Sequence, residues 1–210
     1  MVTESRHPLV RQTLSALRDV GTRPAEFRRL VRVLAGLLAY EATADLPTEP
    51  VQVTTPMGVA PGVRVVDRVG VVPILRAGLG MADGILDLLP EAEVWHVGLY
   101  RDERTLKPRE YYNKIPPRPR MKIALLVDPM LATGGSAIRA CEVVKAAGVP
   151  RLKLISLIAA PEGIAALRDQ MPDVAIHVGA IDERLNEIGF IYPGLGDAGD
   201  RQFNTESTGE

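Results

Sequence analysis

Short, continuously apolar runs alternate with amphipathic helical stretches from residue 69 to residue 180, and this alternation constrains the fold more than any other feature of the chain. A strand that is apolar on both faces must be covered on both faces, as in a parallel sheet whose crossover connections are helices. The pattern therefore predicts an α/β fold with a doubly wound, mostly parallel sheet. The expected strands are 69–75, 93–100, 122–127, 152–159 and 174–180, and the expected helices are 80–89, 134–147 and 161–170.

The chain before residue 69 follows a different pattern. The first 46 residues have apolar side chains at helical spacing, and Thr22 is a candidate N-cap for a helix that begins at Pro24. Residues 51–55 alternate like a half-buried strand, and turns are expected at 56–58 and 61–62. We therefore expect N-terminal helices followed by a short β segment.

Two further segments interrupt or follow the rhythm. Residues 101–120 are highly charged and carry four prolines, which predicts a solvated loop or an extended arm. Residues 189–204 are rich in glycine and have little periodicity, and they would form a C-terminal hood over the sheet. Because the strand–helix rhythm resumes after the first segment, we expect a single domain over residues 1–210.

Composition excludes several classes of protein. Hydrophobic residues make up 46% of the chain and charged residues 24%, which is enough to bury a core. The net charge of −1 does not predict a DNA or RNA partner, because such proteins usually carry a basic excess. Cys141 is the one cysteine, so there is no internal disulfide and no cysteine-based metal cluster. Without a signal peptide or a long apolar run, the expected location is the cytoplasm, with no membrane contact.

Residues 123–136 carry the clearest chemical signal. An apolar strand ends in Asp128, and a short loop then closes with Thr-Gly-Gly-Ser before a helix. Glycines expose backbone amides, a helix N-terminus favours anions, and the hydroxyls of Thr133 and Ser136 add donors, so a phosphate fits this turn. Asp128 could accept hydrogen bonds from a ribose diol. The pattern is neither a Walker P-loop nor a dinucleotide fingerprint, and the plain alternative is a strand–turn–helix with an N-capping serine.

The string Asp-Pro-Met-Leu-Ala-Thr-Gly-Gly-Ser at 128–136 resembles the loop of type I phosphoribosyltransferases that binds 5-phosphoribosyl 1-pyrophosphate (PRPP), in the form found in the uracil branch. Many relatives carry two acidic residues where this chain has Asp128 and Pro129; the departure is typical of the uracil branch and removes one ribose contact. The resemblance implies that PRPP contacts Asp128, Pro129, Met130, Leu131, Ala132, Thr133, Gly134, Gly135 and Ser136.

Two arginines outside this loop extend the resemblance. Arg76 ends a strand before Gly78 and Gly80, and residues 72–84 resemble the pyrophosphate loop of the same family. An arginine beside exposed loop amides suits a pyrophosphate. Arg101 opens the charged arm, which in the family folds over the active site and contacts PRPP. Taken alone, Arg76 would more simply be an exposed arginine after a strand, and a solvated charge run is the plain interpretation of most of residues 102–114.

The glycine-rich segment at 191–201 (IYPGLGDAGDR) also resembles the family, where the matching stretch holds the base. Backbone amides and carbonyls can read the alternating donors and acceptors of uracil without a side chain. The resemblance implies that uracil contacts Ile191, Gly196, Asp197 and Ala198, and that Asp197 also lies near PRPP.

The implied reaction is transfer of the 5-phosphoribosyl group from PRPP to N1 of uracil, which gives UMP and pyrophosphate. Asp128, Arg76 and Arg101 would be the catalytic residues. Mg²⁺ is expected on PRPP, with no metal ligand assigned on the protein. The family also implies a homodimer or homotetramer, and GTP activates some of its members. Two alternatives stay open: a phosphoribosyltransferase for another nucleobase, and an RNA-binding pyrimidine-operon regulator on the same fold.

Overall fold

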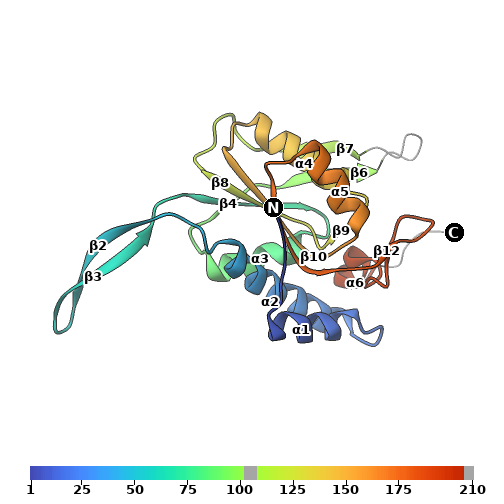
Figure 1. Ribbon diagram of the computed structural model, residues 1–210, viewed down its shortest axis with the longest axis horizontal. Helices are drawn as coiled ribbons and strands as arrows, with labels where there is room; N and C mark the ends of the chain where they lie inside the picture. Colours follow the sequence, from blue (N-terminus) through green and yellow to red (C-terminus); the bar gives the residue numbers. More distant parts are fainter. Residues whose placement is uncertain (102–107, 206–210) are drawn as a thin grey trace.

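A mostly parallel sheet forms the centre of the computed structural model, which describes residues 1–101 and 108–205 (Figure 1). Its main strands lie in the order β1-β11-β10-β8-β4-β6-β7, and all neighbours on this path are parallel except β6 and β7. The expected α/β class is therefore confirmed. The strands are β1 (Val2–Glu4), β4 (Val69–Leu75), β6 (Val97–Arg101), β7 (Pro108–Asn113), β8 (Ile123–Val127), β10 (Arg151–Ala159) and β11 (Ala175–Ile181), while β5 (Glu93–Val94) pairs with β4 and β9 (Met130–Leu131) with β10.

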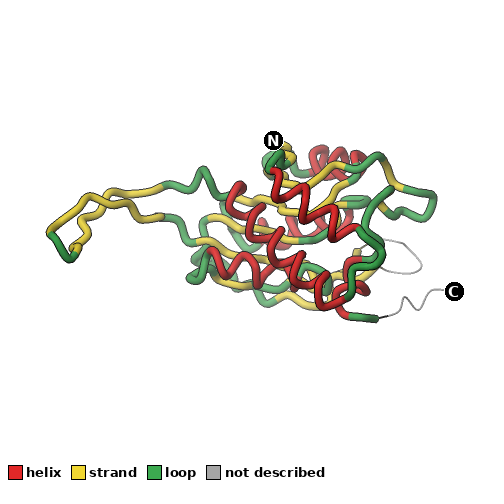
Figure 2. The backbone as a smooth tube through the Cα atoms, turned by 90° about the horizontal axis from the view of Figure 1, so that it is seen from below, coloured by secondary structure: helices red, strands yellow, loops and turns green. Residues whose placement is uncertain are grey.

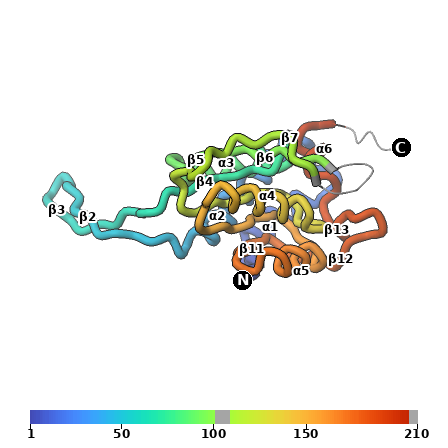
Figure 3. Tube along the Cα trace, turned by 90° about the horizontal axis from the view of Figure 1, so that it is seen from above, coloured from blue at the N-terminus to red at the C-terminus, as the bar shows by residue number. Residues whose placement is uncertain are grey.

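Helices cover both faces of this sheet, as Figures 1 and 3 show. In β8, Ile123, Leu125 and Val127 belong to the apolar cluster that includes the first three helices, whereas Ala124 and Leu126 belong to the cluster that includes the next two. This alternation is the reason why the strand is apolar throughout. The helices are α1 (Pro8–Arg18), α2 (Pro24–Ala42) and α3 (Leu79–Leu88) on one face, and α4 (Gly135–Ala146) and α5 (Pro161–Gln170) on the other.

The N-terminus corrects two expectations. Residues Val2–Glu4 form the edge strand β1 beside β11 and are not helical, because pairing with a strand far along the chain supplies hydrogen bonds that a local pattern cannot reveal. Thr22 does not cap α2. Its hydroxyl donates to the carbonyl of Ala16, and the N-cap position is Arg23, without a side-chain hydrogen bond.

A long hairpin projects from the body of the molecule (Figures 1 and 2). It consists of β2 (Thr48–Thr55) and β3 (Gly58–Val65), which pair antiparallel along their whole length. The turn at 56–57 was predicted correctly, but the turn expected at 61–62 was not, because both residues pair inside β3. Proline is tolerated there because a two-stranded ribbon has only edge strands.

The charged arm and the C-terminal segment are more ordered than their composition suggests. Residues 108–113 of the arm form β7, which pairs with β6 at the edge of the sheet, and residues 102–107 lie outside the described residues. The C-terminal segment contains β13 (Ile191–Tyr192), paired with β12 (Arg184–Leu185), and the short helix α6 (Ala198–Phe203). Within the described part of the chain, no helix is long and apolar enough to cross a membrane.

Candidate active site

The candidate site lies where the chain reverses its direction of winding. Strands β4 and β8 are parallel neighbours, with Pro73 paired to Val127 near their carboxyl ends. The connection after β4 leads to β6 on one side, whereas the connection after β8 leads to β10 on the other. Ligands of open α/β sheets bind at such a switch point. The loops with Arg76 and Asp128 both start there.

The loop after β8 encloses a cavity of about 80 Å³. Its wall comprises Asp128 and residues 130–137, together with Leu154 and Ser156 of β10. The N-cap of α4 is Gly134, with φ 84° and no side-chain hydrogen bond, so the structure does not support the plain alternative of an N-capping serine. The amides of the first helical turn are therefore available for an anion.

Asp128 has an unusual electrostatic environment. Asp128 is partly buried. Burial of its carboxyl group raises the pKa of Asp128 to about 7, and the Asp197 carboxylate makes a smaller contribution in the same direction. The opposing influence is the amide of Met130, which donates to Oδ1 over 3.5 Å. Perturbed carboxyls in clefts are common at functional sites. The C-terminal segment also approaches this edge of the sheet, because a Cβ at Gly199 would lie 3.2 Å from Asp197 Oδ1 and 3.7 Å from Arg76 Nη2.

Arg76 begins the loop after β4, and its guanidinium is accessible. The side chain is 59% exposed, lies 3.3 Å from Asp200 Oδ1, and has its Cζ 6.0 Å from the centre of the Phe203 ring. Gly78 allows the loop to press against β8, because a Cβ there would lie 2.4 Å from the carbonyl oxygen of Val127. The two anion-binding candidates are thus packed side by side.

Two arginines hold the C-terminal segment over this edge of the sheet. Arg18 in α1 forms a bidentate pair with buried Asp182 and also donates to the carbonyl of Gly194, whose amide in turn donates to Asp182. Arg201 donates to the carbonyls of Leu195, Leu17 and Asp19. The segment is therefore packed against α1 by charge-assisted hydrogen bonds, which are stronger than neutral ones.

Comparison with known proteins agrees with this geometry. The family model described as "Uracil phosphoribosyltransferase" matches residues 4–205. The chain belongs to the uracil phosphoribosyltransferase family. It is 58% identical over 201 residues to the uracil phosphoribosyltransferase of Roseiflexus sp. (strain RS-1), covering 96% of this chain and 97% of the relative. It is 54% identical to that of Dictyoglomus thermophilum, covering 98% and 100%.

Solved structures support the fold. A protein from Aquifex aeolicus superposes with a TM-score of 0.91 at 36% identity, over 99% of this chain and 100% of that chain. The adenine phosphoribosyltransferase of Giardia lamblia, solved with 9-deazaadenine, has a TM-score of 0.52 at 14% identity, over 74% of this chain and 81% of that chain, and shows the shared fold alone. The sheet is thus of the type I phosphoribosyltransferase kind, as expected.

The structure brings together most residues expected from the resemblance to uracil phosphoribosyltransferases. Asp128, Arg76 and Asp197 meet at one edge of the sheet, and a Cβ at Gly189 would lie 3.8 Å from the Thr133 methyl group. Arg101 ends β6, but its side chain lies outside the described residues.

Sequence reasoning missed several residues around the site. Ser156 has a buried hydroxyl without a hydrogen-bond partner among the described residues, at the floor of the cavity below the loop. A polar residue inside the apolar run 152–159 was a signal that could have been followed. Gln202, Arg18 and Asp182 were also missed, because nothing in their local sequence shows which distant backbone groups they contact.

Proposed function

We propose that this chain transfers the 5-phosphoribosyl group of PRPP to N1 of uracil and releases UMP and pyrophosphate. The observation that carries the proposal is the convergence of three segments at the switch point: the phosphate-type turn after β8, the Arg76 loop, and the glycine-rich C-terminal segment. Membership of the uracil phosphoribosyltransferase family supports the same reaction and favours uracil over other bases.

The residues around the β8 loop would bind PRPP. The 5′-phosphate would lie against the uncapped first turn of α4, with the Thr133 and Ser136 hydroxyls as additional donors. Asp128 would accept hydrogen bonds from the ribose hydroxyls. Arg76 and Arg101 would bind the pyrophosphate and stabilise it as it leaves. The remaining members of the turn, which supply backbone groups, are Pro129, Met130, Leu131, Ala132, Gly134 and Gly135.

Uracil would be read by backbone groups of the C-terminal segment. Gly194 and Gly196 have positive φ values, which turn their peptide groups in directions that other residues rarely adopt. The proposed contacts are Ile191, Gly196, Asp197 and Ala198. A base held there would lie beside the ribose carbon, because a Cβ at Gly199 of the same segment would lie 3.7 Å from Arg76 Nη2 and a Cβ at Gly189 would lie 3.8 Å from the Thr133 methyl group.

The chemical step needs alignment more than a reactive side chain. As the bond from C1 of the ribose to pyrophosphate breaks, C1 acquires positive character, and uracil N1 forms the new bond from the opposite face. Holding both substrates in this arrangement can supply about 7–11 kcal/mol of the barrier reduction. No protein nucleophile takes part, and no side chain is assigned as the base for N1. The arm at 101–120 would exclude water that could hydrolyse PRPP.

The donor set fits a magnesium ion that is carried mainly by PRPP. Within residues 1–101 and 108–205, no group of three or more His, Cys, Asp or Glu side chains is arranged to hold a metal. Mg²⁺ retains several waters and commonly binds through one or two carboxylates and substrate phosphates. Asp128 and Asp197 are the carboxylates placed to contribute. When bound, Mg²⁺ neutralises the charge that develops on pyrophosphate.

The direct test is UMP formation by the purified protein from uracil, PRPP and Mg²⁺, with cytosine, adenine and hypoxanthine as competing bases. We expect turnover with uracil alone and loss of turnover in Asp128→Asn. Asp45→Asn is a matched control, because Asp45 lies at the opposite end of the strands and pairs with Lys153. Turnover with a purine would contradict the base assignment. No turnover together with salt-dependent RNA binding would favour the regulator.

The expected homo-oligomer has a structural candidate in the β2–β3 hairpin. Alternate residues of β3 expose apolar side chains on one face, including Val59 at 70% and Val63 at 73% exposure. An isolated two-stranded hairpin is marginally stable in water, so a second copy of the chain would stabilise it.

Light scattering should give a multiple of 22.7 kDa for the wild type. Val59→Glu with Val63→Glu should lower that mass, whereas Val20→Glu, in the exposed α1–α2 connection, should not. A wild-type monomer would contradict the proposal.

Activation by GTP and a cytoplasmic location are two further proposals. Activation by GTP, as in some family members, would be detected as a higher rate of UMP formation when GTP is added. The cytoplasm is the expected location, which cell fractionation would test.

A further inference from the structure

Gln202 joins the two halves of the proposed site through one buried amide group. The residue is fully buried in α6, and its Nε2 donates to the carbonyl of Ala77 over 2.9 Å and to that of Ala198 over 3.0 Å. Ala77 follows Arg76 in the loop after β4, and Ala198 belongs to the segment proposed to bind uracil. The bond to Ala77 connects α6 to a loop 125 positions earlier in the chain, and the bond to Ala198, which lies within α6, holds the amide against the start of the same helix.

The surroundings hold this side chain in one position. A Cβ at Gly80 would lie 1.9 Å from Gln202 Oε1, so the amide lies directly against the first turn of α3. Arg28 in α2 donates to the backbone carbonyl of Gln202 over 2.6 Å. Oε1 is buried without a hydrogen-bond partner among the described residues, which is unfavourable. The two bonds from Nε2 and the close packing are what fix the amide.

A second link between these segments is weaker. Arg76 reaches Asp200 and the Phe203 ring at the surface, with a side chain that is 59% exposed. Exposed ion pairs contribute little and are screened by salt. The buried amide of Gln202 is therefore the more rigid connection between the Arg76 loop and the C-terminal segment.

We infer that Gln202 is a positioning residue that couples PRPP binding to uracil binding. PRPP bound at the Arg76 loop would fix the position of Ala77, and the hydrogen bond from Gln202 would then fix the position of the segment at Ala198. Bound uracil would favour PRPP binding in the same way, because coupling between two binding sites is reciprocal. The inference rests on the proposed function, since it assigns PRPP to one segment and uracil to the other. Gln202 touches neither substrate in this account.

The test is Gln202→Met, which keeps the volume but removes both donors. Initial rates of UMP formation with both substrates varied should show KM for PRPP and KM for uracil each raised about tenfold, within the usual range for coupled sites. The value of kcat should stay within about threefold, because the reactive geometry is restored once both substrates are bound. A rise in both KM values without loss of kcat is not expected from general destabilisation.

Arg201→Met is the matched control. Arg201 holds the same segment against α1 and, within the described part of the chain, makes no hydrogen bond to the Arg76 loop, so its loss should raise KM for uracil alone. The inference is overturned if Gln202→Met behaves like Arg201→Met, if neither KM changes, or if kcat alone falls. If circular dichroism shows that Gln202→Met does not fold, Gln202→Asn, whose amide is one methylene shorter, is judged by the same criteria. A wild type that makes no UMP would instead refute the proposed function.

Discussion

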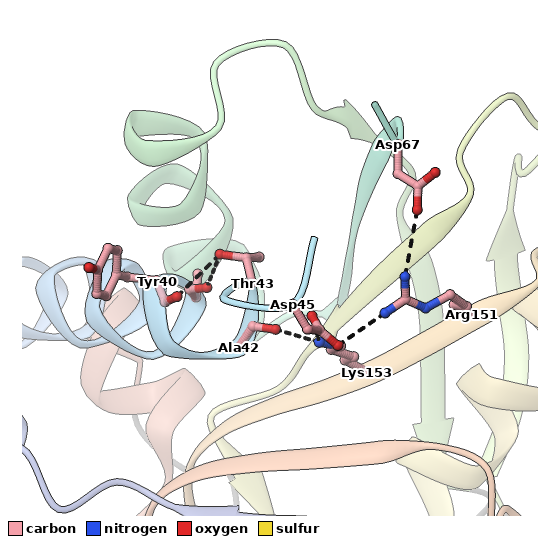
Figure 4. A network of polar contacts seen from close by, with 8 residues as sticks. Tyr40, Ala42, Thr43, Asp45, Asp67, Arg151 and Lys153 are labelled. Atoms are coloured by element: carbon pink, nitrogen blue, oxygen red, sulfur yellow. Dashed lines mark hydrogen bonds and ion pairs between the residues drawn. The ribbon is translucent and has the colours of Figure 1, made fainter. Parts of the chain in front are cut away.

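Two aspartates at opposite ends of the central sheet, Asp45 and Asp128, lie in opposite electrostatic environments. At the amino ends of the strands, buried Lys153 pairs with Asp45 and donates to the carbonyl of Ala42 over 2.6 Å, and Arg151 pairs with Asp45 and Asp67 (Figure 4). The hydrogen bond from Lys153 lowers the pKa of Asp45 below its usual value. These charges satisfy one another and the end of α2.

At the carboxyl ends of the strands, Arg18 pairs with Asp182 and Arg76 with Asp200, but the carboxyl group of Asp128 differs. Among the described residues, Asp128 forms no ion pair, and burial beside Asp197 raises its pKa to about 7. Arg76 is exposed and meets Asp200 over 3.3 Å. A carboxyl group in a cleft with a strongly perturbed pKa is a candidate for a functional role. The difference teaches that pairing within the described part of the chain, and not residue type, separates Asp128 from Asp45.

The largest effect is expected from removing the uncompensated carboxylate. Asp128→Asn keeps the shape of the side chain but weakens its ability to orient the ribose, and a small misplacement of reacting atoms costs about 100-fold in rate. We therefore expect kcat/KM for PRPP to fall by at least about 100-fold, measured as UMP formation. Asp45→Asn should change it by less than about threefold. Equal effects of both substitutions would remove the distinction between the two ends.

The converse effect is expected from breaking the compensated pair. Lys153→Met leaves Asp45 without its buried partner and the carbonyl of Ala42 without a donor. Because Asp45 is itself mostly exposed, we expect a loss of about 2 kcal/mol, below the usual cost of a fully buried pair. For a chain of this size that corresponds to a fall in Tm of about 4–8 °C. The KM values should not change, and a KM rise without thermal destabilisation would contradict this account.

The value of kcat/KM should depend on pH through Asp128, at the carboxyl ends of the strands, and not through Asp45. The Asp128 carboxylate accepts hydrogen bonds, so its protonation below a pKa of about 7 should lower kcat/KM for PRPP by about tenfold per pH unit. The profile of Asp128→Asn measures the titration of PRPP itself and of all other groups. Subtracting that profile should leave an inflection near pH 7, and profiles of identical shape would refute the assignment.

A further effect of the raised pKa concerns stability. The pKa of Asp128 is higher in the folded chain than in the unfolded chain, so the folded state binds more protons between about pH 4 and pH 7 and loses stability as the pH rises through that interval. Asp128→Asn avoids this cost. We expect its Tm to exceed that of the wild type by several degrees at pH 8. The gain should disappear near pH 4, and a gain that is independent of pH would point to another cause.

The sequence predicted the parts of this molecule that depend on local patterns. Continuous apolar strands such as 123–127 and the turn at 133–136 follow from residue type and spacing, and the structure places both as expected. Asp128 and Arg76 could be singled out because each follows a buried strand. Their closeness could be inferred only after the order of strands was known.

The remaining features depend on contacts between distant segments. Strand β1 exists because Val2 pairs with Ile176, and the N-cap of α4 is Gly134 because its backbone turns at a positive φ beside the carbonyl oxygen of Gly163. Gln202 sits in a helix of six residues whose local sequence does not indicate a bond to Ala77. Such residues are set by tertiary packing, which no periodicity records.

One titration compares the two ends of the sheet directly. Carbon-13 NMR of the aspartate carboxyl groups in the free protein, assigned with Asp128→Asn and Asp45→Asn, would follow both residues in a single sample. The account predicts that Asp128 titrates with a midpoint near 7 and Asp45 below its usual value of 3.8. A midpoint for Asp128 below about 5, close to the ordinary range of aspartate, would contradict it.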